Sequence, residues 1–311
     1  MLSRRNVRIK VMQMLYSMSR DSKLGVNDIV NRYRANVDKS FELYLFCLLS
    51  LMRIAGYARL DAAKKSAKLL PSEEDKQFTA KLVENPLMLS LQNNEGLQLQ
   101  FKKYKLTHRF DSDNIRLFYT DFAKGDEYRD YIMQDDNSEE GHRNILLSLF
   151  KHLIANEGYD EFLEDNYANW IDDKSLIVGA IKKTIKALPA EADFFEEYQP
   201  SAEAVEEFGE KLLRKACESD EDLLGIIEPT LRNWDADRVA VIDMILLKMA
   251  LCELMDFPSI PTKVTLNEFV EISKLYSTDK SKDFINGILD RLMKQLHKEG
   301  KIQKTGRGLQ E

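Results

Sequence analysis

The apolar residues between positions 239 and 254 are too numerous to lie on one side of a helix. They are Val239, Val241, Ile242, Ile245, Leu246, Leu247, Met249, Leu251 and Leu254. A helix that is apolar on all sides is buried on all sides. The pattern therefore predicts a central core helix within the stretch from Trp234 to Leu296. Pro258 and Pro261 follow the helix and end it, because proline cannot continue one.

Two more helices are predicted after these prolines. Thr265 and Glu268 have the spacing of a capping box, in which a hydroxyl and a carboxylate bond backbone N–H groups at a helix start. This spacing predicts a helix over 266–276. The next segment has one apolar face at helical spacing, formed by Ile285, Ile288, Leu289, Leu292, Met293 and Leu296. Phe284 lies at the edge of this face, where it fits either the core or a contact with a partner.

The first helix combines an apolar face with a cationic start. The apolar face consists of Val7, Val11, Met14, Leu15 and Met18, and Ser3 can cap the helix. Arg4, Arg5 and Arg8 lie in the first turns, where the helix dipole disfavours cations. A bound anion would remove this cost, because helix N-termini and guanidinium groups both bind phosphate. The sequence pattern fits either a phosphate-binding site or a solvated basic N-terminus. Tyr16 either stacks on a base or packs in the core.

Residues 41–199 predict a long helical region. Phe41–Leu70 has the pattern of an amphipathic helix or helix pair, and 98–133 and 143–188 have that of helical hairpins. The aromatic residues of the first hairpin are expected in the core, because nearby acids would repel RNA phosphates. Acidic pairs such as Asp135-Asp136 have no matching histidine or nucleophile. This indicates solvated acids rather than catalytic pairs.

Composition fits a helical protein with two domains. Of the 311 residues 44% are hydrophobic and 31% are charged, and glycine and proline are few. The nearest approach to a membrane span, 41–54, is short and contains Glu42 and Arg53. The N-terminus has no apolar core of a signal peptide. A cytoplasmic protein without membrane contact is expected.

The residues that usually carry metal or cofactor chemistry are scattered. Cys47, Cys217 and Cys252 lie in apolar helical patterns, which predicts reduced core cysteines. No metal-ligand spacing occurs, so neither a metal nor a cofactor nor a catalytic residue is predicted. The net charge of −7 argues against RNA binding over the whole surface, but the basic first twenty residues permit a local site. The basic tail, 298–311, is expected to be mobile.

With both ends considered, the chain resembles the NusB family of transcription antitermination factors. Residues 4–17, RRNVRIKVMQMLYS, are similar to the family's first-helix pattern RRxARxxAxQxLY. NEFVEISK at 267–274 and FINGILD at 284–290 are similar to its second bundle, which ends in FVNGVLD. The resemblance implies an all-α pair of helical bundles with an inserted helical region. Its expected divisions are 1–40 for the first part of the core, 41–199 for the insertion, 200–297 for the C-terminal bundle and 298–311 for the tail.

The resemblance also implies a function. A NusB-like protein would bind the boxA element of nascent ribosomal RNA together with the ribosomal protein NusE, in an antitermination complex on RNA polymerase, without enzymatic activity. The implied RNA contacts are Arg4, Arg5, Arg8 and Tyr16, and the implied NusE contacts are Tyr276, Lys280 and Phe284. Lys280 and Asp283 reverse the charges found at these positions in some members, and Met244 replaces a usually basic residue. The partner contact is therefore expected to be rewired or charge-swapped.

Two other functions fit the sequence less well. One is a protein-binding scaffold, in which the acidic insertion binds a basic partner and RNA contact is minor. The other is an RNA-binding accessory domain related to ribosomal RNA cytosine methyltransferases. An enzyme of that kind needs a glycine-rich cofactor loop and a reactive cysteine in a motif, and the sequence has neither. The sequence fits either a monomer or a homodimer.

Overall fold

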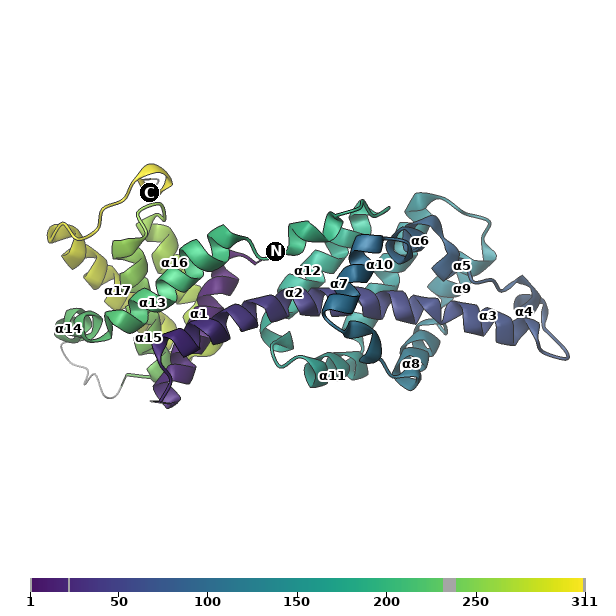
Figure 1. The fold of residues 1–311 in the computed structure, drawn as a ribbon, viewed down its shortest axis with the longest axis horizontal. Coiled ribbons are helices and arrows are strands. Elements are labelled where there is room, and N and C mark those ends of the chain that lie inside the picture. The colour runs from purple at the N-terminus through teal and green to yellow at the C-terminus, as the bar shows by residue number, and fades with distance from the viewer. Residues whose placement is uncertain (1, 22, 232–238, 310–311) are drawn as a thin grey trace. The chain divides into compact units, whose positions relative to one another are not determined.

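The computed structural model describes residues 2–21, 23–231 and 239–309, and every regular element in these ranges is helical (Figure 1). The all-α prediction is thereby confirmed. Trp234, with which the predicted core stretch begins, lies outside the described residues. The chain forms two compact units. Unit 1 comprises Asp38–Gln199, and unit 2 comprises Leu2–Val37 and Pro200–Glu311.

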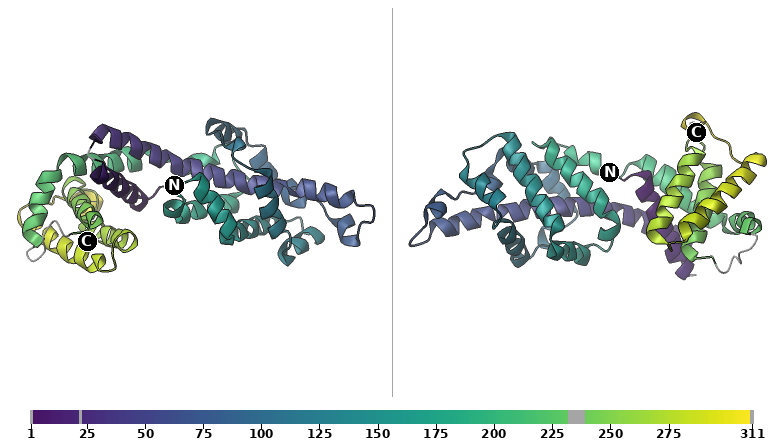
Figure 2. Two further views of the ribbon diagram at one scale, coloured as in Figure 1. Left: turned by 90° about the horizontal axis from the view of Figure 1, so that it is seen from below. Right: turned by 180° about the vertical axis from the view of Figure 1, so that it is seen from behind.

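Unit 2 is a bundle around one central helix. Its elements are α1 (Arg4–Arg20), the first part of α2 (Val26–Gly56), the π-helix η3 (Glu203–Glu210), α13 (Lys211–Glu218), α14 (Asp220–Leu231), α15 (Val241–Asp256), α16 (Thr262–Tyr276) and α17 (Ser281–Lys298). Helix α15 packs against α1, α13, α14, α16 and α17. Both views in Figure 2 show α1, in purple, beside the green and yellow C-terminal helices. The predicted central core helix is therefore present, although its first residue, Val241, is 40% exposed.

The helices at both ends of unit 2 follow the sequence pattern. Ser3 caps α1, because its side chain accepts a hydrogen bond from the Asn6 N–H. The predicted apolar face of α17 is buried apart from Met293, which is half-buried. Gly209 allows η3 to approach α1 and α2 closely. A Cβ at this position would collide with the Tyr33 hydroxyl and with Cγ1 of Val7.

Helix α16 begins one turn before the predicted start. Its N-cap is Pro261 and its first residue is Thr262. Thr265 is buried within the helix, and its hydroxyl donates to Oε1 of Glu253 at 2.8 Å. The predicted capping box is therefore wrong. The Thr265 side chain contacts α15, and the Glu268 side chain contacts α1.

The C-terminal tail, which the sequence predicts to be mobile, packs on unit 2 in the structure. Ile302 is buried, and Nζ of Lys304 donates to the carbonyl oxygens of Glu253 at 3.2 Å and Phe257 at 3.0 Å. These carbonyls lie at the C-terminal end of α15, where a cation is favourable. The short helix η5 (Gly306–Leu309) follows. The tail is held because it satisfies the end of a core helix.

Unit 1 has its own core around the second part of α2. Its other elements are α3 (Ala58–Ser66), α4 (Glu73–Gln77), α5 (Lys81–Glu84), α6 (Pro86–Gln92), α7 (Glu95–Lys103), η1 (Leu106–His108), α8 (Ser112–Phe122), α9 (Asp126–Met133), α10 (Glu139–Ala155), α11 (Glu157–Asn166), α12 (Trp170–Ala187) and η2 (Phe194–Tyr198). Each predicted hairpin thus contains more than two helical elements. Phe118, Tyr119 and Phe122 are buried in the core, as expected.

The apolarity of α2 comes from its central position in a core. The segment Val26–Ser66 has the length and composition of a membrane-crossing helix, with a mean hydropathy of 1.4 in its most apolar window. However, 78% of that window is buried inside the structure. Hydrogen bonds from Ser40 to Asp173 and between Tyr44 and Thr184 join α2 to α12. Burial against other helices is thus sufficient to explain this composition.

Candidate functional site

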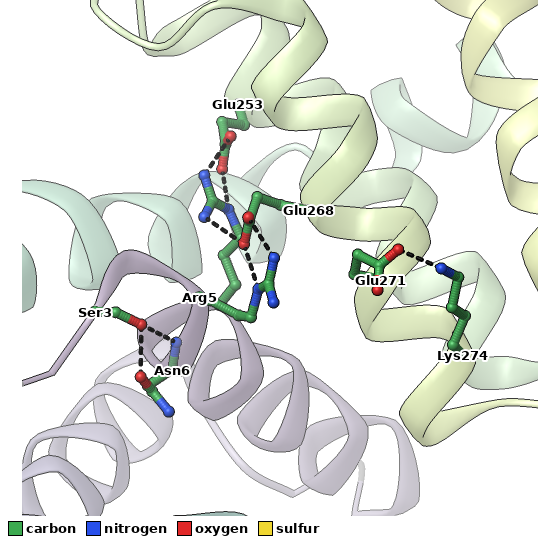
Figure 3. Close-up of polar contacts among 8 residues, drawn as sticks. Ser3, Arg5, Asn6, Glu253, Glu268, Glu271 and Lys274 are labelled. Atoms are coloured by element: carbon green, nitrogen blue, oxygen red, sulfur yellow. Dashed lines mark hydrogen bonds and ion pairs between the residues drawn. The ribbon is translucent and has the colours of Figure 1, made fainter. Parts of the chain in front are cut away.

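The three arginines at the start of α1 have different environments, and only two of them are accessible. The Arg8 side chain is 2% exposed, whereas those of Arg4 and Arg5 are 43% and 46% exposed. Figure 3 shows the polar contacts that hold this region, with Glu253 and Glu268 beside the N-terminal helix. Of the three arginines predicted to contact RNA, Arg4 and Arg5 are accessible and Arg8 is buried.

Arg8 is a structural residue. Its Nε and Nη2 donate to the two carboxylate oxygens of Glu253, both at 2.7 Å, and Nη1 lies 3.5 Å from Oε2 of Glu268. Its guanidinium also lies over the rings of Phe208 and Phe269, at 5.1 Å and 5.8 Å from their centroids. A buried charge needs such complete pairing. Direct contact between Arg8 and RNA, which the resemblance implies, does not fit this position.

Arg5 forms a two-point ion pair at the surface. Its Nε and Nη2 donate to the Glu268 carboxylate at 2.8 Å and 2.7 Å. These bonds raise the pKa of Arg5 and lower the pKa of Glu268, because each charge stabilises the other. Arg4 is held more loosely, with Nη2 at 3.1 Å from Oε1 of Glu203. Both arginines keep further N–H donors that can reach a phosphate.

Tyr16 lies apart from these arginines on the same helix. It is eleven residues beyond Arg5, so the two Cα atoms are roughly 16 Å apart along the helix axis. The Tyr16 side chain is 36% exposed, and the Arg20 guanidinium lies 5.0 Å from its ring centroid. An RNA strand that contacts Arg5 and Tyr16 together would have to follow α1 for about three turns.

Two of the three residues implied in partner binding line a pocket of about 650 Å³ in unit 2. Lys280 and Phe284 both line it, together with Asp243, Ser281, Ile288 and Arg291. Tyr276 is half-exposed and is not among the lining residues. The structure thus brings two of the three implied residues together.

Asp243 is the residue of this pocket that sequence reasoning missed. It is only 4% exposed, and its Oδ2 accepts a hydrogen bond of 2.7 Å from the Ser281 hydroxyl. Its Oδ1 is buried and has no hydrogen-bond partner among the described residues. The signal that could have pointed to it is an acid in the first turn of a largely apolar helix. An unpaired buried carboxylate oxygen is costly, and a donor from a bound partner would satisfy it.

The cysteines lack the properties of reactive thiols. Cys47 and Cys252 are buried and Cys217 is half-buried, and all three are free. Burial raises the pKa of Cys217 to about 11 and that of Cys252 to about 12, so both thiols are protonated near neutral pH. In the described part of the chain, no group of three or more histidine, cysteine, aspartate or glutamate residues is arranged to hold a metal ion.

Comparison with known proteins identifies one family model and several similar proteins. The NusB family model matches residues 143–294. The transcription antitermination protein NusB of Salinibacter ruber is 44% identical over 103 residues, which cover 33% of this chain and 64% of that protein. Its counterpart in Chloroherpeton thalassium is 38% identical over 99 residues, covering 32% and 47%. That of Syntrophotalea carbinolica is 43% identical over 94 residues, covering 30% and 60%.

The extent of these matches differs from the extent of the units. The matched part of this chain spans about half to under two thirds of the length of these relatives. The family match begins within α10 and ends within α17, so it includes residues 143–199 of unit 1 and leaves out α1. No solved structure matches this chain.

Proposed function

We propose, from the match of the NusB family model to residues 143–294, that this chain is a non-enzymatic transcription antitermination factor of that family. It binds boxA-type nascent RNA together with the ribosomal protein NusE, and the complex acts on RNA polymerase in the cytoplasm. Its similarity to proteins named transcription antitermination protein NusB supports the role. The single structural observation that carries it is the pair of accessible arginines at the N-terminus of α1.

RNA contact is assigned to Arg4, Arg5 and Tyr16. The two arginines add forked donors to a helix start that already favours anions. Tyr16 is partly exposed further along the helix, where a base can stack on its ring. Arg8 acts indirectly: its pairing with Glu253 fixes α1 against α15, and so it fixes the positions of Arg4 and Arg5.

Reversing the two accessible charges tests this site. The Arg4→Glu, Arg5→Glu variant should bind boxA-type RNA more weakly and with a smaller salt dependence, because fewer phosphate contacts release fewer counterions. Arg8 is left unchanged, since its loss would destabilise the bundle. The matched control is Arg116→Glu, an exposed arginine of α8 in unit 1 that also has a carboxylate partner, Asp113. Equal affinity of the site variant, the control and the native protein would exclude the site and favour the scaffold function.

Partner contact is assigned to the pocket that Phe284 and Lys280 line. The unpaired Oδ1 of Asp243 supports a partner that supplies a hydrogen-bond donor, and Phe284 supplies apolar area at the rim. The lining carries Lys280 and Arg291 but also Asp243, Asp279 and Asp283, so acids outnumber bases and a basic donor group on the partner is favoured. Tyr276 is close in sequence to Lys280 but does not line the pocket, so we assign it only a peripheral contact with the partner.

A binding measurement separates this role from packing. Phe284→Ala should weaken capture of NusE by more than it lowers the melting temperature, and Asp243→Asn should weaken it by removing the acceptor charge. Val264→Ala on α16 is the control, because Val264 is 43% exposed and lies outside the pocket. A large loss of stability with undiminished capture would place Phe284 in the core and end this assignment.

A further inference from the structure

Unit 2 contains a second group of arginines that sequence reasoning did not single out. Arg34 lies on α2 and Arg214 on α13, and both pair with one carboxylate, that of Glu210 at the end of η3. Glu210 and Arg214 are only four residues apart, but Arg34 is 176 residues from Glu210, so no local motif marks the group of three. Their meeting is a product of the tertiary fold.

The geometry of this group is that of a clamp. Oε2 of Glu210 accepts from Nε and Nη2 of Arg34 at 2.9 Å and 2.6 Å. Oε1 of the same carboxylate accepts from Nε of Arg214 at 2.9 Å, and Nη1 of Arg214 donates to Oδ1 of Asn27 at 3.2 Å. One nearly buried carboxylate thus fixes both guanidinium groups. Less side-chain conformational entropy is therefore lost when a ligand binds.

The clamp keeps an excess of positive charge. The bonds with Arg34 and Arg214 outweigh the effect of burial and lower the pKa of Glu210, so Glu210 is ionised near neutral pH. Two arginines and one glutamate leave a net charge of +1. The side chains of Arg34 and Arg214 are 54% and 35% exposed. Among the described residues, Nη1 of Arg34 and Nη2 of Arg214 have no acceptor.

We propose that Arg34 and Arg214, held by Glu210, form a second phosphodiester-binding site for the RNA that the start of α1 binds. Two guanidinium groups that a carboxylate holds in place, with free N–H donors, bind a phosphate better than mobile arginine side chains do. Helix η3 connects the two sites, because Glu203 at its beginning pairs with Arg4 and Glu210 at its end pairs with the clamp. The inference rests on the proposed function.

The test compares the clamp with an arginine of equal charge on the same helix. The double variant Arg34→Ala, Arg214→Ala should bind boxA-type RNA about tenfold more weakly, because charge-assisted hydrogen bonds are lost. The slope of log affinity against log salt should become shallower by about 0.7, the value for one single-strand phosphate contact. Arg32→Ala removes an exposed arginine two residues from Arg34 that has no place in the clamp, and it should change affinity much less.

A second variant keeps the charge and removes the fork. Arg34→Lys, Arg214→Lys should lose most of the same affinity, whereas a purely electrostatic surface would be unaffected. Circular dichroism and melting temperature establish that each variant is folded. Equal affinities for the clamp variants, Arg32→Ala and the native protein would overturn the inference while leaving the α1 site intact. Failure of the native protein to bind RNA would overturn the proposed function as well. In a last outcome, inorganic phosphate raises the melting temperature of the native protein while the variants leave RNA affinity unchanged. That result would show a small-anion site and would also overturn the inference.

Discussion

Arg8 of α1 and Glu253 of α15 form a buried ion pair in which two N–H groups donate to two carboxylate oxygens at 2.7 Å. The same carboxylate accepts from the Thr265 hydroxyl, and Arg8 also approaches Glu268, which holds Arg5. One network therefore joins α1, α15 and α16 and ends at an accessible arginine. The buried Arg8 and the accessible Arg5 of the candidate RNA surface are linked through Glu268.

Removing one partner of the buried pair should be strongly destabilising. Arg8→Ala leaves Glu253 charged and without its main partner, which costs about 3–5 kcal/mol in comparable buried pairs. Urea denaturation monitored by circular dichroism measures the change. Arg4→Ala on the same helix is the control, since its surface pair with Glu203 is worth about 1 kcal/mol or less. Similar losses in the two variants would contradict the structural role of Arg8.

The hydroxyl of Thr265 should matter through Glu253 and not through a helix cap. Thr265→Val keeps the shape but removes a hydrogen bond to a charged acceptor, with an expected loss of about 1.5–3 kcal/mol. Thr265→Ser retains the hydroxyl and should lose less. Thermal unfolding of both variants gives the comparison. If Ser were no better than Val, the hydrogen bond to Glu253 would not be the cause.

Acid should weaken unit 2 through Glu268. Its hydrogen bond to Arg5 lowers its folded-state pKa below the ordinary value of 4.5. The stabilisation is therefore present above the unfolded-state pKa and is lost as pH falls through the folded-state pKa. Unfolding free energies measured between pH 7 and pH 3 should fall below about pH 4.5. Glu268→Gln should be less stable at pH 7 and should show a shallower acid loss; an identical pH profile would refute the linkage.

Two glycines should respond to alanine with opposite signs. Gly209→Ala places a Cβ against Val7 and the bonded hydroxyl of Tyr33, and such overpacking costs about 1–3 kcal/mol. Gly225 lies within α14, and a Cβ there meets no atom within 4 Å. Gly225→Ala should therefore gain up to about 1 kcal/mol from helix propensity. Melting temperatures that move in the same direction would contradict the close packing of η3.

The docked tail should contribute to the stability of unit 2. Lys304→Met removes two hydrogen bonds to carbonyl oxygens at the end of α15 and should cost about 1–2 kcal/mol. Lys301→Met removes only a surface pair with Glu299 and should change stability by less than about 1 kcal/mol. Denaturant unfolding compares the two. Equal effects would mean that the tail does not stabilise α15.

Periodicity and local capping were sufficient to predict several features of this protein. The all-helical class, the Ser3 cap, the core face of α17 and the central position of α15 follow from spacing, because each depends on neighbours within a few residues. The resemblance of both ends to the NusB family also came from contiguous motifs. These features need no knowledge of what lies across the bundle.

Tertiary structure decided the roles of the charged residues. Arg4, Arg5 and Arg8 are alike in sequence, but only Arg8 faces α15, where Glu253 can compensate its burial. Thr265 and Glu268 have the spacing of a capping box, but their side chains bind charged residues of other helices instead. The Thr265 hydroxyl donates to Glu253, and the Glu268 carboxylate accepts from Arg5. The Arg34 and Arg214 clamp joins residues 180 positions apart. The environment of a charge depends on the side chains that the fold brings to it, and the spacing of residues along one helix does not contain that information.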